Sequence, residues 1–240
     1  MKVDILAIGV HPDDVELSCS GTLLKHKAQG KSFGLLDLTL GELGSRGTAQ
    51  LRTIEAMNAA KILGATFREQ LDLGDGFFEH NRASIEAIVK IIRYCQPEIV
   101  LCNALNDRHP DHGRSAKLEV DACFFSGLQR IETEFRGEKQ MPWRPKAVYH
   151  YIQDIQLTPD FVVDITPFME QKIDSILAYE SQFHNPNYTK EEVQTPISGK
   201  GFMEFMYAKN RVFARSINTE FAEGFNTSRI FGVHDLFDLI

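Results

Sequence analysis

The sequence predicts an α/β fold, a Rossmann-like three-layer sandwich with a mainly parallel sheet and a C-terminal elaboration. Short apolar runs that end at turn residues predict strands, and longer stretches with apolar residues at helical spacing predict helices. The two kinds of segment alternate over residues 1–127. Such alternation implies right-handed crossovers between parallel strands. The remainder shows no clear linker or repeat, so we expect a single domain over residues 1–240.

The alternating part divides into four strand–helix pairs. Strands are predicted at about 3–9, 32–40, 69–73 and 98–102, and helices at about 16–29, 48–63, 82–95 and 112–127. The third helix has the clearest pattern, because Ile85, Ile88, Val89 and Ile92 fall on one face.

The rest of the chain is less regular. Residues 128–143 are expected to form a surface excursion. Later strands are predicted at about 146–152 and 160–164, and later helices at about 167–183 and 201–215. The polar segment 185–200 contains Pro and Gly and is expected to be a mobile loop or lid, in which Tyr188 is either a substrate contact or a plain exposed tyrosine. The tail from 220 to 240 shows no clear pattern.

Composition places the chain among ordinary globular proteins. Its 240 residues are 43% hydrophobic and 25% charged, which allows a sizeable core and argues against extended disorder. The formal net charge of −7 argues against a protein that binds nucleic-acid phosphates through a basic face. No apolar run is long enough to span a bilayer, and the first residues do not resemble a secretory signal.

Cysteine usage points to a reducing compartment. None of the four cysteines forms a Cys-x-x-Cys pair, and most lie in apolar segments: Cys19, Cys95, Cys102 and Cys123. We therefore expect buried, reduced thiols in a cytoplasmic protein.

A cluster of polar residues follows the first predicted strand. His11, Asp13 and Asp14 lie within four residues of one another, directly after an apolar run. In an α/β fold, ligands bind beyond the carboxyl ends of such strands. An imidazole and two carboxylates suit a divalent metal. The plainer alternative is that Asp13 or Asp14 caps the following helix and that Pro12 only starts a turn.

A second histidine-rich turn follows the predicted strand that ends at Cys102. It contains His109, Asp111 and His112. Two such turns on two strands of one sheet are expected to converge at its ligand-binding edge. Two imidazoles and a carboxylate that leave positions open for water and substrate form the pattern of a catalytic zinc site. The plainer alternative for this turn alone is a solvated polar loop.

Together these motifs resemble the zinc-dependent N-acetylglucosaminyl deacetylases of the LmbE/PIG-L family. The resemblance rests on His-Pro-Asp-Asp-Val-Glu at 11–16 and His-Pro-Asp-His at 109–112. It extends through Thr-Leu-Gly-Glu at 39–42, Arg-Gly-Thr at 46–48, Leu-Gly-Asp-Gly at 73–76 and Ala-Tyr-Glu-Ser-Gln-Phe at 178–183. Within the family, the sequence looks most like the bacillithiol-biosynthesis deacetylases, which act on an N-acetylglucosamine–malate conjugate.

The resemblance implies a role for each site residue. The metal ligands correspond to His11, Asp14 and His112. The catalytic residues correspond to Asp13 as general base, His109 as a stabiliser of the oxyanion, and Asp111 as the group that orients His109. A sugar-hydroxyl contact corresponds to Arg52, and Glu42 and Asp75 are expected to act in the same way. Glu16 is left with a structural role.

The resemblance also implies the cofactor and the partners. Zn2+ is the expected cofactor, although other divalent first-row metals suit the same ligands. The expected partner is a small amino-sugar substrate, with neither nucleic acid nor membrane. A homo-oligomer is expected, with a hexamer as one form that the resemblance allows. A malate aglycone would need a cationic contact, for which Arg46 and Arg108 are candidates.

The implied chemistry divides the two adjacent aspartates between two tasks. Asp14 would hold the metal, and Asp13 would accept a proton from the attacking water. Asp111 would favour a protonated His109 beside the oxyanion. Either Asp13 or His109 could protonate the leaving amine.

Three other functions remain open from the sequence. The same site could belong to an amidase that acts on another N-acyl substrate. A metal-stabilised sugar-binding protein would bind the conjugate and release no acetate. A nucleotide-binding module is disfavoured, because the first strand lacks a Gly-x-Gly-x-x-Gly turn.

Overall fold

The computed structural model describes residues 1–183 and 193–238. Its main sheet has seven strands in the order β3-β2-β1-β4-β7-β9-β8. The strands are β1 (Ile5–Gly9), β2 (Phe33–Asp37), β3 (Phe67–Gln70), β4 (Ile99–Cys102), β7 (Ala147–Tyr151), β8 (Phe161–Asp164) and β9 (Ala222–Asn226). The first five of these pair in parallel, whereas β9 runs antiparallel to β7 and β8. The predicted mainly parallel sheet is confirmed.

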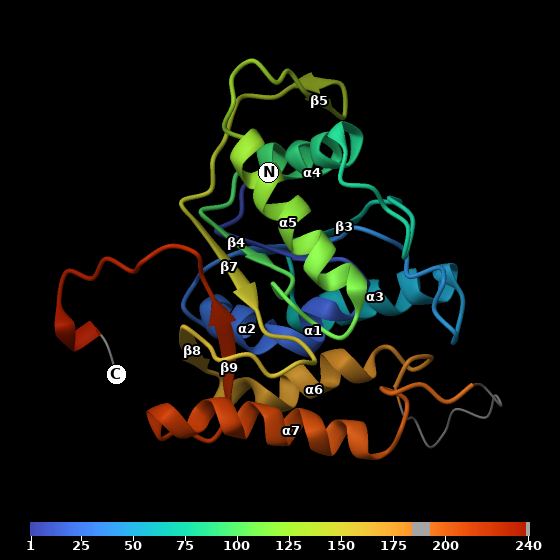
Figure 1. Ribbon diagram of the computed structural model, residues 1–240, viewed down its shortest axis with the longest axis vertical. Helices are drawn as coiled ribbons and strands as arrows, with labels where there is room; N and C mark the ends of the chain where they lie inside the picture. Colours follow the sequence, from blue (N-terminus) through green and yellow to red (C-terminus); the bar gives the residue numbers. More distant parts are fainter. Residues whose placement is uncertain (184–192, 239–240) are drawn as a thin grey trace.

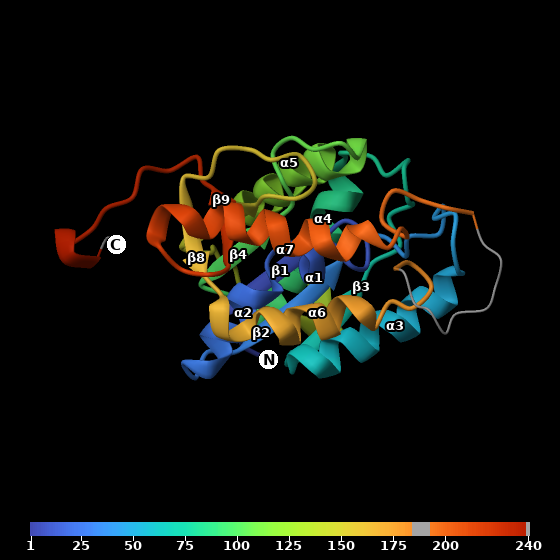
Figure 2. The ribbon, with the colours of Figure 1, turned by 90° about the horizontal axis from the view of Figure 1, so that it is seen from below.

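The helices form layers on both faces of this sheet (Figures 1 and 2). They are α1 (Asp14–Ser18), α2 (Ser20–Ala28), α3 (Ala49–Leu63), α4 (Arg82–Cys95), α5 (Pro110–Phe125), α6 (Met169–Leu177) and α7 (Gly201–Ala214). One core cluster joins α4 and α5 to the sheet, and another joins α1, α2 and α3 to its opposite face. Among the described residues, none of the helices is long and apolar enough to cross a membrane.

Side-chain alternation along β1 explains why both faces are covered. Leu6 and Ile8 belong to the cluster under α4 and α5, whereas Ile5 and Ala7 belong to the cluster under α1 to α3. Successive side chains of a strand point to opposite faces, so a wholly apolar strand must be buried on both. That the whole chain forms one domain stays a prediction.

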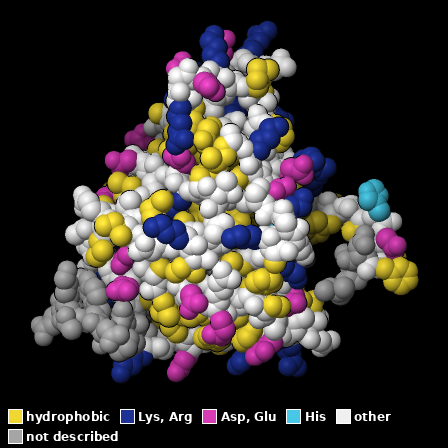
Figure 3. Space-filling model, turned by 180° about the vertical axis from the view of Figure 1, so that it is seen from behind, with side chains coloured by type: hydrophobic (Ala, Val, Ile, Leu, Met, Phe, Trp, Pro, Cys, Tyr) yellow, Lys and Arg dark blue, Asp and Glu magenta, His cyan; other side chains and the backbone are white. Residues whose placement is uncertain are grey.

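Charged side chains of both signs are interspersed on the face that Figure 3 shows, and no broad basic area is seen on it. That nucleic acid is not a partner stays a prediction, drawn from the net charge of −7. The last described residues, from 227 onward, lead away from the body of the molecule (Figure 1).

The structure corrects three predicted helices and adds one strand that was not predicted. The helix expected at 16–29 is broken at Cys19 into α1 and α2, and the helix expected at 112–127 begins earlier, at Pro110. The helix expected at 167–183 ends at Leu177. The strand β9 was not predicted, because Glu223 and Gly224 interrupt its apolar pattern. The surface excursion at 128–143 contains a small hairpin, β5 (Glu134–Phe135) with β6 (Glu138–Lys139).

A buried ion pair explains the break between α1 and α2. Lys172 Nζ lies 2.7 Å from Glu223 Oε1 and donates to two carbonyls at the end of α1. The Glu223 carboxylate in turn accepts hydrogen bonds from the backbone N–H groups of Gly21 and Thr22, at 3.0 and 2.7 Å. A cation at the end of one helix and an anion at the start of the next favour two short helices in place of one long helix.

Replacing Lys172 by methionine is expected to lower the free energy of unfolding by about 3–5 kcal/mol, because it leaves the Glu223 carboxylate buried without its cation. Urea unfolding followed by circular dichroism measures the change. The double variant Lys172→Met/Glu223→Gln is expected to recover part of the loss. A single variant as stable as the wild type would contradict the prediction.

Glu16 has a structural position beneath the first histidine motif. Its Oε1 lies 2.5 Å from Arg68 Nη1, and the same guanidinium pairs with Asp37 at 2.7 Å. All three side chains are buried. This network anchors α1 to β2 and β3, so it supports the loop that carries His11, Asp13 and Asp14.

Candidate active site

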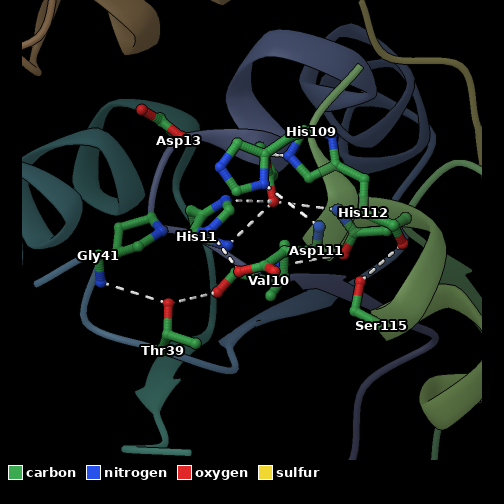
Figure 4. Close-up of polar contacts among 12 residues, drawn as sticks. Val10, His11, Asp13, Thr39, Gly41, His109, Asp111, His112 and Ser115 are labelled. Carbon is green, nitrogen blue, oxygen red and sulfur yellow. Dashed lines mark hydrogen bonds and ion pairs between the residues drawn. The ribbon is translucent and has the colours of Figure 1, made fainter. Parts of the chain in front are cut away.

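The two histidine motifs meet at the carboxyl ends of β1 and β4. These strands pair in parallel and lie where the strand order changes direction, so their following loops leave at the same edge. The ring centroids of His11 and His109 are 4.7 Å apart, those of His109 and His112 are 5.2 Å apart, and those of His11 and His112 are 5.6 Å apart. Figure 4 shows these imidazoles gathered beside the start of α5.

Asp14 is buried between two of the imidazoles. Its Oδ1 lies 3.2 Å from His112 Nε2, and its Oδ2 lies 3.8 Å from His11 Nδ1. The amide groups of Asn103 and Gln153 each donate a hydrogen bond to this carboxylate at 3.0 Å. These contacts hold both oxygens of Asp14 in place beside the nitrogen atoms that face them.

Other carboxylates hold the opposite nitrogen of each ring. Asp75 Oδ1 lies 3.0 Å and Asp111 Oδ2 lies 3.4 Å from His11 Nε2. Asp107 Oδ2 lies 2.6 Å from His112 Nδ1. Histidines that bind metals show this arrangement, in which one ring nitrogen contacts a carboxylate and the other faces the metal.

The electrostatics of this cluster suit a cation. Burial alone would lower the pKa of His11 and His112. The hydrogen bonds that His11 donates to Asp111 and Asp75 raise its pKa to about 10, and the charge of Asp14 together with the hydrogen bond that His112 donates to Asp107 raises the pKa of His112 to about 9. Burial would raise the pKa of Asp14, and the positive imidazoles lower it below its ordinary value. Protons therefore occupy the ring nitrogens that a metal would take.

The donor set fits a divalent metal. Among the described residues, two groups of donor atoms lie within 4.8 Å of one another, His11 with His109 and His112, and His11 with Asp75 and Asp111. Both groups contain His11. The prediction that His11, Asp14 and His112 are the ligands stays a prediction, and the 3.2 Å contact between Asp14 and His112 supports it.

Asp13 lies apart from the imidazoles and contacts Arg52. It is buried, its φ of 115° is rare for a residue other than glycine, and Arg52 Nη2 lies 3.0 Å from its Oδ2. Burial raises the pKa of Asp13 to about 7, which the charge of Arg52 opposes and the charge of Asp14 favours. Asp13 occupies the N-cap position of α1, but its side chain makes no capping hydrogen bond. The capping alternative for Asp13 is therefore wrong.

The predicted substrate contacts have different surroundings. Arg52 lines the cavity, but its Nη groups already donate to Asp13 and to the carbonyls of Pro12 and Gly41. Glu42 holds loop backbone, because it accepts hydrogen bonds from the N–H groups of Leu40 and Asp75. It is absent from the cavity lining that the described residues form. Sugar binding by these residues stays a prediction.

We expected the Asp111 carboxylate to orient His109, but this carboxylate contacts other groups. The Asp111 carboxylate accepts hydrogen bonds from Gly76 N at 2.9 Å and Arg114 Nη1 at 3.2 Å, and approaches His11. Only its backbone N–H reaches His109, at Nδ1. The reason is that α5 begins at Pro110, so that Asp111 lies in the first helical turn and its side chain points toward the loop after β3.

The surroundings of His109 favour its neutral form. Burial lowers its pKa, and the charges of His11 and His112 lower it further. Its Nδ1 accepts a hydrogen bond from the backbone N–H of Asp111, which leaves the proton on Nε2.

The sequence reasoning missed four residues of the site. Asn103 follows β4 directly and Gln153 follows β7, so both lie at the same sheet edge as the histidine motifs and could have been found by the same rule. Asp107 lies five residues before His112 and gave no pattern of its own. Lys209 comes from α7, where nothing local marks it.

Replacing Asp107 by asparagine is expected to weaken metal binding about 10- to 100-fold, because His112 loses the carboxylate that orients its ring. Competition with a zinc-sensitive chelating dye measures the affinity. Asp160→Asn, a change at an exposed aspartate just before β8, is the control and should bind as the wild type does. Equal affinity of both variants would contradict this role for Asp107.

A cavity of about 380 Å³ opens over the cluster. It is lined by Asp13, Asp14 and the three histidines, and also by the loop after β2, by residues 195–197 and by α7. Part of the segment predicted as a lid, 193–200, therefore borders the cavity. Tyr188 and the rest of that segment lie outside the described residues.

Known proteins share these features. Residues 6–123 match the family model "PIG-L: GlcNAc-PI de-N-acetylase". Diacetylchitobiose deacetylase from Thermococcus kodakarensis is 31% identical over 189 residues, which cover 75% of this chain and 70% of the relative. A solved structure of a conserved protein from Thermus thermophilus superposes with a TM-score of 0.84 at 33% identity, over 97% of this chain and 98% of its own.

A relative with a different name shows that the fold hosts more than one reaction. 4-Oxalmesaconate hydratase from Pseudomonas putida is 26% identical over 90% of this chain and 88% of its own length. The family match spans both histidine motifs, and the deacetylase relative is covered over more than two thirds of its length. This chain belongs to the PIG-L/LmbE family of deacetylases.

Proposed function

We propose that this protein is a metal-dependent hydrolase that removes the N-acetyl group from an N-acetylglucosamine conjugate and releases acetate and a free amine. The observation that carries the proposal is the division between two adjacent carboxylates. Asp14 contacts His11 and His112, whereas Asp13 contacts Arg52 and has a pKa of about 7. A base with a pKa near the working pH, beside a set of metal donors, suits amide hydrolysis.

The residues proposed to hold the metal are His11, Asp14 and His112. Zinc is the proposed ion, and other divalent first-row metals suit the same donors. When bound, such an ion polarises a carbonyl and lowers the pKa of water. Asp75, Asp111 and Asp107 would keep the two imidazoles oriented.

Asp13 is proposed to take a proton from the attacking water. The guanidinium of Arg52 holds its carboxylate in place, and the deprotonated form is present at neutral pH. His109 would donate a hydrogen bond from Nε2 to the developing oxyanion. A neutral imidazole is a poor acid, so we assign the proton that leaves with the amine to Asp13, which has just accepted one.

Support for an amino-sugar substrate comes from the relatives. One is a diacetylchitobiose deacetylase, and another, from Saccharomonospora viridis, is a 1D-myo-inositol 2-acetamido-2-deoxy-α-D-glucopyranoside deacetylase. The acetylated amino sugar is common to both names, and the group attached to it differs. The conjugate proposed for this chain is N-acetylglucosaminyl-malate, which the sequence resemblance implies. A homo-oligomeric state and a cytoplasmic location stay predictions.

The test is acetate release from N-acetylglucosaminyl-malate, diacetylchitobiose and simple N-acyl amines, with and without a chelator. Release from the sugar conjugates that stops with chelator and returns with zinc is the expected result. Release from the simple amines alone would favour an amidase. Binding of the conjugates with no acetate would favour a sugar-binding protein, and hydration of 4-oxalmesaconate would favour the reaction named for the Pseudomonas putida relative.

A further inference from the structure

Lys209 is a buried cation at the wall of the active-site cavity, and it has no ionic partner among the described residues. It is 7% exposed and lines the cavity together with His112, Gln153 and Asp154. Its Nζ donates to the carbonyl oxygens of Ile152, at 3.0 Å, and Gln153. Within residues 1–183 and 193–238, no carboxylate lies within 4.0 Å of this ammonium group.

The other cations of the cavity wall are already paired. Arg52 pairs with Asp13, and Arg108 pairs with Asp154. Arg46, one of the two residues expected to contact a malate aglycone, is absent from the described lining and donates to the carbonyl of Ser181. Of the described residues that line the cavity, Lys209 is thus the one cation that lacks a carboxylate partner.

An uncompensated buried ammonium group is costly, because two carbonyl dipoles replace only part of its lost hydration. The cost shows in the pKa of Lys209, which burial and the charge of Lys172 lower to about 8. An ammonium group has three N–H donors, and the two carbonyls account for two of them. A ligand anion would supply both the missing charge and the missing acceptor.

The position of Lys209 indicates which part of the substrate it would contact. It lies on α7, which also gives Phe205 and Met206 to the cavity wall, and the acetyl group must lie at the histidine cluster for the proposed reaction. Lys209 comes from a different element than the histidines, so the part of the substrate that it would contact is the aglycone. Asp154, already paired with Arg108, borders the same part of the cavity.

Resting on the proposed function, we propose that Lys209 selects N-acetylglucosamine conjugates whose aglycone carries a carboxylate, by pairing its ammonium group with that carboxylate. The competing possibility is a purely structural role. Lys209 holds the backbone of Gln153, whose side chain binds Asp14, so its loss could disturb the metal donors and lower activity on every substrate equally.

The experiment compares N-acetylglucosaminyl-malate with its uncharged diamide, two substrates of the same size, for the wild type, Lys209→Met and Lys209→Arg. We expect Lys209→Met to lower kcat/KM for the malate conjugate about 10- to 100-fold more than for the diamide, mainly through KM. Lys209→Arg should restore part of the preference, because it keeps the charge. Arg211→Met, at an exposed position on the same helix, should leave the preference unchanged.

Two results would overturn the proposal. Equal losses on both substrates in Lys209→Met would show that Lys209 only supports the metal donors, and the proposed function would stand. A wild type that releases acetate from neither substrate would overturn the proposed function and this inference together. Metal content, measured in each variant, separates loss of metal from loss of aglycone binding.

Discussion

Asp13→Asn is expected to lower deacetylation at least about 100-fold while the protein keeps its metal. The amide cannot accept a proton from water, whereas Asp14, His11 and His112 keep their contacts. Asparagine is the right replacement, because it tolerates the positive φ of 115° better than alanine does. Initial rates of acetate release, together with metal per chain by mass spectrometry, measure both effects. Wild-type activity in the variant would refute the assignment of Asp13 as base.

The pH dependence of activity and of stability gives a second check on the role of Asp13. Burial raises the pKa of Asp13 to about 7 in the metal-free protein, and a bound cation would lower it again. The kcat/KM of the metal-loaded wild type should therefore fall at a pH below 7, when Asp13 becomes protonated. In the metal-free protein the folded-state pKa of 7 lies above the ordinary value of 3.8, so the folded state binds more protons between these values. Stability contributed by protonated Asp13 is therefore lost as the pH rises through 7. Metal-free Asp13→Asn should be more stable than the wild type at pH 8, and lower stability would contradict the raised pKa.

His112→Ala is expected to lower the metal affinity at least about 10-fold, and deacetylation with it. The change removes a predicted ligand and leaves two carboxylates, Asp14 and Asp107, without the ring between them. Zinc per chain after dialysis against a weak chelator is the measurement. Full occupancy would refute His112 as a ligand.

A matched control for this variant is His80→Ala. His80 is exposed and pairs with Asp121 at 3.0 Å on the surface. Its loss should change neither metal content nor activity.

In the metal-free protein, His112→Ala should also lose stability below pH 9, since the folded-state pKa of His112 is raised to about 9 and its charged form stabilises the fold below that pH. An unchanged unfolding temperature at pH 7 would argue against the paired, charged imidazole.

The sequence by itself determined the parallel sheet and the place of the site. Alternating apolar strands and amphipathic helices are local patterns, and the helix at 82–95 has the predicted bounds. Parallel strands send the loops at their carboxyl ends to one edge. The sequence alone therefore predicts that His11 and His112 lie close together in the fold, although they are far apart in the chain.

Only the tertiary structure decided which side chains support the site. Asp75 contacts His11 from 64 residues away, and Gln153 contacts Asp14 from 139 residues away. Such contacts depend on how loops and helices pack, and they leave no periodic pattern in the sequence from which they could be predicted. The start of α5 at Pro110 turned Asp111 toward His11 and not toward His109, and the docking of α7 placed Lys209 at the cavity. Local sequence patterns determine where helices and strands form. The direction of one side chain depends in addition on the residue at which its helix begins and on the groups that tertiary packing places next to it.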